Sequence, residues 1–303
     1  MTISETNRGA ADASSAPDTS VVASASAVGQ LGPLRAADAG ISLRRYLGEL
    51  WSRRDYIRFV AGSELRSQQM NTVLGNVWHV LNPALQIGVF YLIFGVVLGV
   101  NRGVDNLLAF ITVGLFSYQF STKSVTAGAK SITANRAILR SVWFPRAMLP
   151  VTTTFTQFLS FLPMLVIMPA ICLVTGEPVR VTWLLVPAII ALQLTLNLGL
   201  AFFAARAASH IPDVQQLLPY VFRMLLYASG VIFLVDEYVE NSSYRLLFEL
   251  NPFYGIVSLW RWAVLDYDIN SHVLGFTSAV AVVSLIAGFL WFRRGEQSYT
   301  HEN

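Results

Sequence analysis

The sequence has 303 residues, of which 54% are hydrophobic and only 13% charged. Ordinary soluble domains carry about 25% charged residues, so this composition excludes a typical soluble globular protein and indicates a chain surrounded by lipid. The net charge of +3 comes from 19 arginines against 2 lysines. In so hydrophobic a chain this is typical of basic loops beside a membrane, and we expect no nucleic-acid partner.

The first 40 residues are rich in alanine, serine, aspartate and glycine and contain no sustained apolar run. Such a composition cannot bury enough apolar surface to fold alone, and it lacks the hydrophobic region of a signal peptide. Residues 1–40 are therefore predicted to be a disordered cytosolic tail.

Residues 42–60 repeat apolar side chains at helical spacing, with Ser42 as a candidate N-cap. Much of the remaining surface carries arginines, namely Arg44, Arg45, Arg54 and Arg58. This pattern predicts an amphipathic helix in the cytosolic membrane interface, with its arginines toward lipid headgroups. Packing against a protein partner is the alternative. The helix belongs to a segment, residues 41–81, that leads into the first membrane span.

Six charge-poor segments approach or exceed the length of about 20 residues that a membrane-spanning helix needs. We predict that they form an all-α, six-span transmembrane domain over residues 82–294, followed by a short cytosolic tail at 295–303. The predicted spans are residues 82–100, 106–122, 147–176, 181–205, 214–235 and 273–292.

Basic residues are distributed unevenly among the segments that connect these spans. With a cytosolic N-terminus, sixteen of them lie inside and four outside, and Arg223 lies within the fifth span. Because cytosolic loops carry the excess of arginine and lysine, the sequence predicts a multi-pass protein with both termini in the cytosol.

Residues 252–265 are apolar but too short to span a bilayer, which favours a re-entrant or interfacial segment between the fifth and sixth spans. On the outer face it would narrow or gate an exit. A plain aromatic belt is the alternative. The candidate residues of this segment are Asn251, Pro252, Trp260, Arg261 and Trp262.

Several catalytic and nucleotide-binding patterns are missing from the sequence. It contains no P-loop, no G-x-G-x-x-G turn, no H-E-x-x-H and no G-x-S-x-G. No acidic residue lies inside the predicted spans, which excludes a conventional intramembrane proton relay. Cys172 is the single cysteine. We therefore expect a non-catalytic chain with no metal or cofactor of its own, driven by energy from elsewhere.

The largest predicted loop between spans on the cytosolic side contains residues 130–146. Asn135 is a candidate N-cap for two or three helical turns, which Pro145 ends. Ile138 pairs with Val142, Leu139 pairs with Trp143, and Arg136 and Arg140 form a cationic pair on another face. Such a helix would dock in a groove of a cytosolic motor. A membrane-surface helix without a partner is the alternative.

Four motifs, in order along residues 42–294, carry a resemblance to a known family. The chain resembles the permease subunits of ABC-2-type exporters of polysaccharides, which move O-antigen, teichoic acid and mycobacterial galactan. The motif residues are Arg66, Leu74, Gly75, Trp78 and Pro83, then Asn135, Ile138, Leu139, Phe144, Pro145, Arg146, Leu149 and Pro150, then Asp213, and finally Leu250, Asn251 and Pro252.

This resemblance implies a homodimer in which each copy pairs with a separate ABC ATPase that binds ATP and Mg²⁺. The pair would carry a lipid-linked glycan from the cytosol across the bacterial inner membrane. The coupling segment of the family corresponds here to Asn135, Arg136, Ile138, Leu139, Arg140, Trp143 and Phe144. The alanine-rich tail and the preference for arginine suggest a high-GC bacterium, so a galactan is the narrower expectation.

Sugar rings stack on aromatic faces, which makes aromatic residues of the first, second and fifth spans candidates for the translocation path. They are Phe90, Phe94, Phe116, Phe120, Tyr220 and Tyr227. Ordinary helix packing is the alternative for each. Arg223 lies about 15 Å from the cytosolic end of its span. A cation there is costly, so it meets either the carrier's pyrophosphate in a wet pore or another helix's carbonyls.

Three other functions stay open. An ABC-2 permease for drugs or small lipids would share the fold and the motor. A multispanning glycosyltransferase would use the external acids Asp236, Glu237, Asp266 and Asp268. An energy-independent scaffold would leave the coupling helix without a purpose.

Overall fold

The computed structural model describes residues 43–67, 77–97, 99, 104–136, 139, 144–239 and 242–296. Within these ranges every regular element is helical and no strand occurs, which confirms the predicted all-α class. They belong to one unit of the chain, residues 43–303. The predicted tail, residues 1–40, lies outside the described ranges.

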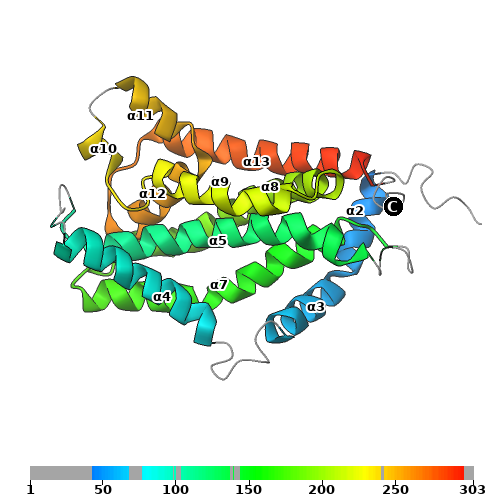
Figure 1. The fold of residues 1–303 in the computed structure, drawn as a ribbon, viewed down its shortest axis with the longest axis horizontal. Coiled ribbons are helices and arrows are strands. Elements are labelled where there is room, and N and C mark those ends of the chain that lie inside the picture. The colour runs from blue at the N-terminus through cyan, green and yellow to red at the C-terminus, as the bar shows by residue number, and fades with distance from the viewer. Residues whose placement is uncertain are drawn as a thin grey trace, which may run out of the picture. The chain divides into compact units, whose positions relative to one another are not determined.

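The helices follow one another with short connections (Figure 1). They are α2 (Leu43–Ser52), α3 (Arg54–Ser67), α4 (Trp78–Phe90) with a π-helical continuation η2 (Tyr91–Val97), α5 (Leu107–Ala134), α7 (Met148–Val174), a 3₁₀ turn η3 (Val181–Leu185), α8 (Val186–His210), α9 (Val214–Ala228), α10 (Val235–Tyr238), α11 (Ser242–Glu249), α12 (Pro252–Leu265) and α13 (Ser271–Arg294).

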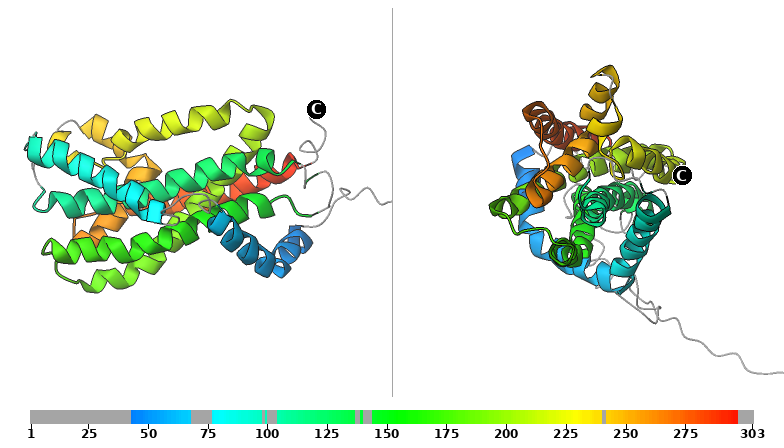
Figure 2. Two further views of the ribbon diagram at one scale, coloured as in Figure 1. Left: turned by 60° about the horizontal axis from the view of Figure 1, so that its bottom comes forward. Right: turned by 90° about the vertical axis from the view of Figure 1, so that its left-hand side faces the viewer.

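Helix α5 is the centre of the unit. It packs against α7, α8, α9 and α12, while α13 packs mainly against α8 (Figures 1 and 2). Alanine, glycine and serine recur along α5 and are buried there, for example Ala109, Ser117, Gly128 and Ala129. Small side chains let neighbouring helices approach closely in a lipid environment, where no hydrophobic force drives helices together. This explains why the most polar of the long helices lies in the middle.

Three described helical segments are long and apolar enough to cross a membrane: Met148–Val174, Val181–His210 and Ser271–Arg294. They correspond to the third, fourth and sixth predicted spans. The segment Leu81–Val97 is apolar but shorter. The chain is thus a multi-pass helical protein, and the count of six spans stays a prediction.

Two helices differ in length from the predicted spans. Helix α5 continues to Ala134, beyond the predicted span end at Thr122, and hydroxyl groups such as those of Thr126 and Ser131 bond to carbonyls of their own helix in this extension. The loop after it therefore begins at Asn135. Helix α9 ends at Ala228 instead of continuing to Val235. Gly230, with φ of 59°, takes the left-handed conformation that ends the helix.

The amphipathic helix predicted over 42–60 is two helices, α2 and α3, with a break at Arg53. The two pack on different partners. Tyr46 of α2 stacks edge-on against Phe289 of α13, with ring centres 5.9 Å apart. In α3, Glu64 accepts a hydrogen bond of 3.1 Å from Thr156 of α7. Helix α2 therefore contacts α13, and α3 contacts α7.

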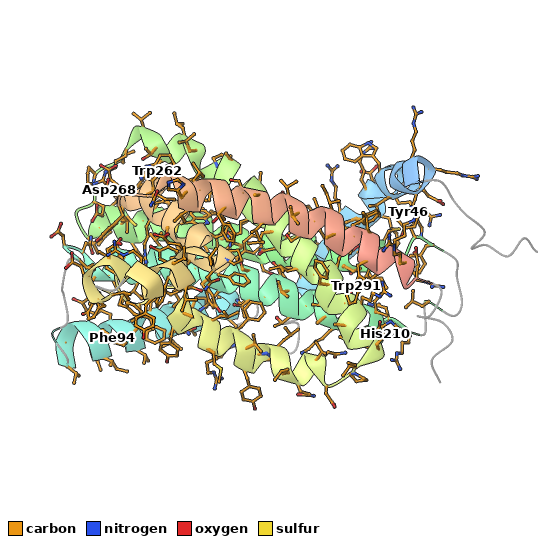
Figure 3. All side chains as sticks on the ribbon, turned by 90° about the horizontal axis from the view of Figure 1, so that it is seen from above. Tyr46, Phe94, His210, Trp262, Asp268 and Trp291 are labelled. Carbon is orange, nitrogen blue, oxygen red and sulfur yellow. The ribbon has the colours of Figure 1, made fainter. Side chains whose placement is uncertain are left out.

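The two ends of the bundle carry different side chains (Figure 3). Tyr46, His210 and Trp291 lie toward one end, and Phe94, Trp262 and Asp268 lie toward the other. The α9–α12 junction and the α7–α8 loop belong to the second end (Figure 1). The predicted cytosolic and outer segments thus lie at opposite ends of the bundle.

Helices α8 and α13 approach each other closely at Gly199 and Gly288. A Cβ added to Gly288 would lie inside the van der Waals distance of the Gly199 carbonyl oxygen. Nearby, Arg206 of α8 lies over the ring of Trp291, 4.4 Å from its centre, and donates to the Trp291 carbonyl.

We expect Gly288→Ala to destabilise the protein by about 1–3 kcal/mol, because the added methyl forces the backbones of α8 and α13 apart. The matched control is Gly275→Ala on the same helix, where an added Cβ meets no atom within 4 Å. Alanine is the better helix former, so the control should be neutral or stabilising. Thermal unfolding of the purified protein in detergent measures both variants. Equal midpoints would contradict the close approach.

Candidate functional site

The predicted coupling segment begins where α5 ends. The backbone N–H of Asn135 donates to the Ile132 carbonyl (3.2 Å), and its side-chain amide donates to the Ser131 carbonyl (2.9 Å). The side chain thus serves the end of α5, which corrects the predicted N-cap. The Asn135 carbonyl does accept from the N–H of Leu139 (3.1 Å), as in a further helical turn.

The other predicted coupling residues are only partly described. Leu139 is buried, whereas Arg136 and Phe144 are half-buried. Ile138, Arg140 and Trp143 lie outside the described residues. Contact with an ATPase therefore stays a prediction for the whole set.

A polar clamp holds the chain where it leaves the predicted coupling segment. The Tyr46 hydroxyl donates to Glu296 Oε1 (2.9 Å) and accepts from the N–H of Ala147 (3.2 Å). The same Glu296 oxygen accepts from the N–H of Arg146 (2.7 Å). Three distant segments, α2, the start of α7 and the residues after α13, therefore meet at one carboxylate.

The phenol of Tyr46 is the proton donor of this clamp. Burial, and then the nearby charge of Glu296, raise the pKa of Tyr46 above its ordinary value. The hydroxyl therefore stays protonated at physiological pH. The guanidinium of Arg293 lies 5.3 Å from the centre of the Tyr46 ring. The phenol of Tyr46 therefore keeps its proton, with which it donates to Glu296, at neutral pH.

Helix α9 carries three of the predicted path residues on its exposed side. Tyr220 is 63% exposed and Tyr227 is 53% exposed. Arg223 lies between them, is exposed, and makes no hydrogen bond or ion pair to any described residue. Phe222 and Leu226, on the opposite side, are buried. Arg223 therefore does not bond to carbonyls of another described helix of the same chain.

The other predicted path aromatics lie in two environments. Phe90 and Phe94 are half-buried neighbours, with ring centres 6.3 Å apart, at the junction of α4 and η2. Phe116 and Phe120 are buried within α5, where Phe120 stacks on Phe161 of α7 with ring centres 4.7 Å apart. In this single chain Phe116 and Phe120 pack helices together. A role on the path stays a prediction for all four residues.

The predicted outer segment is helix α12, which has the predicted bounds of Pro252–Leu265. The side chain of Asn251 links α12 to α9, because its amide oxygen binds one helix and its amide nitrogen binds the other. Its Oδ1 accepts from the N–H of Phe253 (3.0 Å), which caps α12. Its Nδ2 donates to the Ala228 carbonyl (3.1 Å) and to the Ser229 hydroxyl (3.0 Å), which closes α9. The Asn251–Pro252 pair thus links the end of one helix to the start of the next.

Arg261 of α12 is 5% exposed and holds the turn that follows α9. Its two terminal nitrogens donate to the carbonyls of Gly230 (2.7 Å) and Val231 (2.6 Å). Its guanidinium carbon lies 3.4 Å from the centre of the Phe110 ring of α5. The planar fork of arginine matches two adjacent carbonyls and stacks on an aromatic face. This cation is therefore part of the core and not a surface charge.

Trp260 and Trp262 differ in their surroundings. Trp260 has no exposed surface, and its indole N–H donates to Oε1 of Gln193 in α8 (2.8 Å). The amide nitrogen of Gln193 donates to the Ser117 carbonyl (2.7 Å) and to Ser121 Oγ (2.8 Å) of α5. Trp262 is half-buried. Trp260 therefore cannot belong to a lipid-facing aromatic belt, and re-entry of α12 into the membrane stays a prediction.

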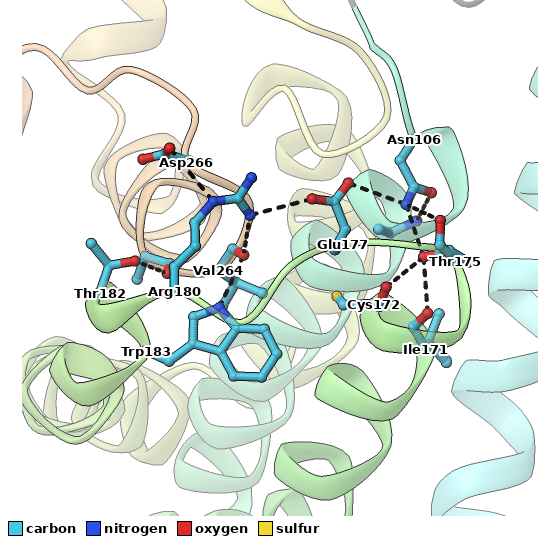
Figure 4. A network of polar contacts seen from close by, with 12 residues as sticks. Asn106, Ile171, Cys172, Thr175, Glu177, Arg180, Thr182, Trp183, Val264 and Asp266 are labelled. Carbon is cyan, nitrogen blue, oxygen red and sulfur yellow. Dashed lines mark hydrogen bonds and ion pairs between the residues drawn. The ribbon is translucent and has the colours of Figure 1, made fainter.

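A second polar network joins α12 to the loop between α7 and α8 (Figure 4). Arg180 forms ion pairs with Glu177 (3.3 Å) and Asp266 (3.5 Å) and donates to the Val264 carbonyl (3.3 Å). Asn106, which caps α5, donates to Glu177 (3.2 Å). Asp266 ends α12 with φ of 64°.

Two of the external acids considered as catalytic groups make ion pairs. Besides the pair of Asp266 with Arg180, Asp236 lies 3.4 Å from Arg245. Both acids are therefore paired with arginines in the folded chain. Among the described residues, no group of three or more histidine, cysteine or acidic side chains could hold a metal ion.

The model of the ABC-2 type transporter family matches residues 57–265. The chain belongs to the ABC-2 type transporter family. This confirms the family predicted from the motifs. The match starts within α3 and ends with α12, so it contains Arg223, Asn251 and Arg261 but neither Tyr46 nor Glu296.

Individual relatives extend the likeness over most of the chain. The O-antigen export system permease protein RfbA of Myxococcus xanthus is 26% identical over 258 residues, 84% of this chain and 98% of that protein. Its namesake from Klebsiella pneumoniae is 22% identical over 255 residues, 84% and 96% of the two chains. The polysialic acid transport protein KpsM of Escherichia coli is 22% identical over 241 residues, 78% and 91% of the two chains.

Sequence reasoning missed two features of this ABC-2 chain. The first is the hydrogen-bond network of Gln193 with α5 and α12. The sequence held a signal for it, since a buried amide within an apolar span needs a partner from another helix. The clamp of Tyr46 and Glu296 gave no such signal, because its members lie 250 positions apart and outside any motif.

We expect Arg261→Lys to destabilise the protein by about 2 kcal/mol or more. Lysine keeps the charge but cannot donate to both carbonyls in the plane of the fork, so at least one buried acceptor is left unpaired. Arg245→Lys, at an exposed ion pair, is the matched control and should change stability by less than about 1 kcal/mol. The midpoint of thermal unfolding in detergent measures both. Equal effects would show that Arg261 does not hold the turn.

Proposed function

We propose that this chain is the transmembrane permease subunit of an ATP-driven exporter, which moves a lipid-linked polysaccharide from the cytosol across the bacterial inner membrane. The observation that carries the proposal is the alignment with O-antigen export permeases over 84% of this chain and almost their whole length. The polysialic acid transport protein supports polysaccharide as the general cargo class. A galactan is the narrower proposal, and it rests on composition alone.

The energy would come from a separate ABC ATPase that binds ATP and Mg²⁺, so this chain would be non-catalytic and hold no cofactor. The segment from Asn135 to Phe144 is the proposed contact. It continues directly from the central helix α5 and leads to the clamp at Arg146. A displacement of this segment would therefore act on α5 and on the start of α7 together.

The path would lie between two copies of the chain, in a complex of two permeases and two ATPases. The proposed interface would use exposed apolar side chains of α4, η2 and α9, the elements that also carry predicted path residues. These side chains are Leu85, Val89, Val96 and Val97 on the first two elements and Leu217, Tyr220, Met224 and Tyr227 on α9. Arg223, exposed among the last four, would meet the pyrophosphate of the lipid carrier. Both termini would lie in the cytosol, following the distribution of basic residues.

The proposed motor is tested by purifying the chain after co-expression with the ABC ATPase gene beside its own. We expect the ATPase to co-purify at near-equal amount, because the proposed complex contains two permeases and two ATPases. Quantitative mass spectrometry of the monodisperse fraction measures the ratio. A stable permease that retains no ATPase would overturn the exporter assignment.

We expect Arg223→Gln to lower export about tenfold while leaving folding intact, because a charge-assisted contact to the pyrophosphate is lost. The measurement compares glycan at the cell surface with the lipid-linked pool inside, in a strain complemented by the variant. Arg44→Gln, at an exposed arginine of α2 outside the predicted path, is the control and should export normally. Unchanged export by a well-folded Arg223→Gln protein would remove Arg223 from the path.

A further inference from the structure

A groove separates α2 and α3 from the first turns of α7. Its cavity volume is about 380 Å³, which lies within the range of small-molecule sites. The lining residues are Leu50, Trp51, Arg54, Ile57 and Arg58 from α2 and α3, and Val151 and Phe155 from α7. The groove is therefore lined mainly by apolar groups on both sides, and Arg54 and Arg58 are the two charged residues among its lining.

The two arginines have spare capacity for an anion. Arg54 lies 5.7 Å from the centre of the Trp51 ring and has no acidic partner among the described residues. Arg58 pairs with Asp55 at 3.4 Å, but both side chains are mostly exposed. An exposed pair of this kind contributes little, so Arg58 is available to a phosphate at small cost.

The position of the groove matches the depth of lipid headgroups. Val151 and Phe155 lie in the first two turns of α7, one of the described helices apolar and long enough to cross a membrane. Trp51, which lines the groove, is 72% exposed, and Phe59 of α3 is 76% exposed. Aromatic side chains are enriched at the boundary between headgroups and acyl chains. An acyl chain along α7 would thus leave its phosphate level with the arginines.

We propose that this groove binds one anionic phospholipid of the bilayer, with its phosphate on Arg54 and Arg58 and one acyl chain against Val151 and Phe155. Residues 43–67 carry six arginines against three acids. A second copy of the same segment would be repelled, whereas an anionic headgroup is attracted. The bound lipid would fasten α2 and α3 to the start of α7. The inference does not depend on the cargo that the protein exports.

Native mass spectrometry of the delipidated full chain, titrated with phosphatidylglycerol and separately with phosphatidylcholine, tests the site. We expect one phosphatidylglycerol to bind before all others, and phosphatidylcholine to bind more weakly. Arg54→Gln with Arg58→Gln should weaken that first binding event about fivefold for each charge removed. Arg44→Gln with Arg45→Gln removes the same charge from exposed positions outside the groove and should leave the event nearly unchanged.

A third variant separates a defined groove from diffuse attraction. Val151→Trp fills the groove without changing any charge, and we expect it to remove the first binding event while the melting temperature shows that the protein is folded. Equal weakening by the two arginine pairs, or unchanged binding to Val151→Trp, would overturn the proposal. Displacement of phosphatidylglycerol by a tenfold lower concentration of polyprenyl phosphate would assign the groove to the carrier lipid instead.

Discussion

The end of the bundle that contains the α9–α12 junction (Figure 1) depends on how a helix ends inside an apolar environment. Helix α9 stops at Ala228 and α12 starts beside it at Pro252. Backbone groups freed at such breaks find no water in a bilayer, so the protein itself must satisfy them. Asn251 serves the ends of both helices, and Arg261 binds the carbonyls of Gly230 and Val231. The buried guanidinium of Arg261 takes the place of water as the donor to both of these carbonyls.

This arrangement explains which parts of the fold the sequence could predict. The long apolar runs of α7, α8 and α13, and the bounds of α12, follow from hydrophobicity and from the Asn251–Pro252 start signal. Hydropathy does not mark the end of α9, since residues 229–235 are as apolar as the helix before them. Gly230 is the local stop signal, and its left-handed φ and the contact with Arg261, across 31 positions, show how the structure uses it. The partner that holds this turn is tertiary, and no local pattern identifies Arg261.

The end of α5 lies beyond the end of the predicted span for a different reason. Its last turns contain serine, threonine and two lysines, which suggested a loop by composition. The helix nevertheless continues through them to Ala134, and their hydroxyls bond to carbonyls of the same helix. The candidate site shows the same division. Its motif residues could be located from the sequence, whereas the buried state of Phe116, Phe120 and Trp260 depends on which helices surround them.

Helix α9 packs on the bundle through the buried side chains of Phe222 and Leu226, and hydrogen bonds hold it at three points along its length. Gln215, in its first turn, donates to Thr133 near the end of α5 (2.9 Å). At its middle the Tyr118 hydroxyl of α5 donates to the Phe222 carbonyl (2.5 Å), and at its end Asn251 binds the Ala228 carbonyl. The bond to Thr133 lies two residues before Asn135, where the proposed coupling segment begins. A movement imposed there would therefore reach α9, and the arginine it exposes, through a direct bond from α5 and without passing through the lipid-facing helices.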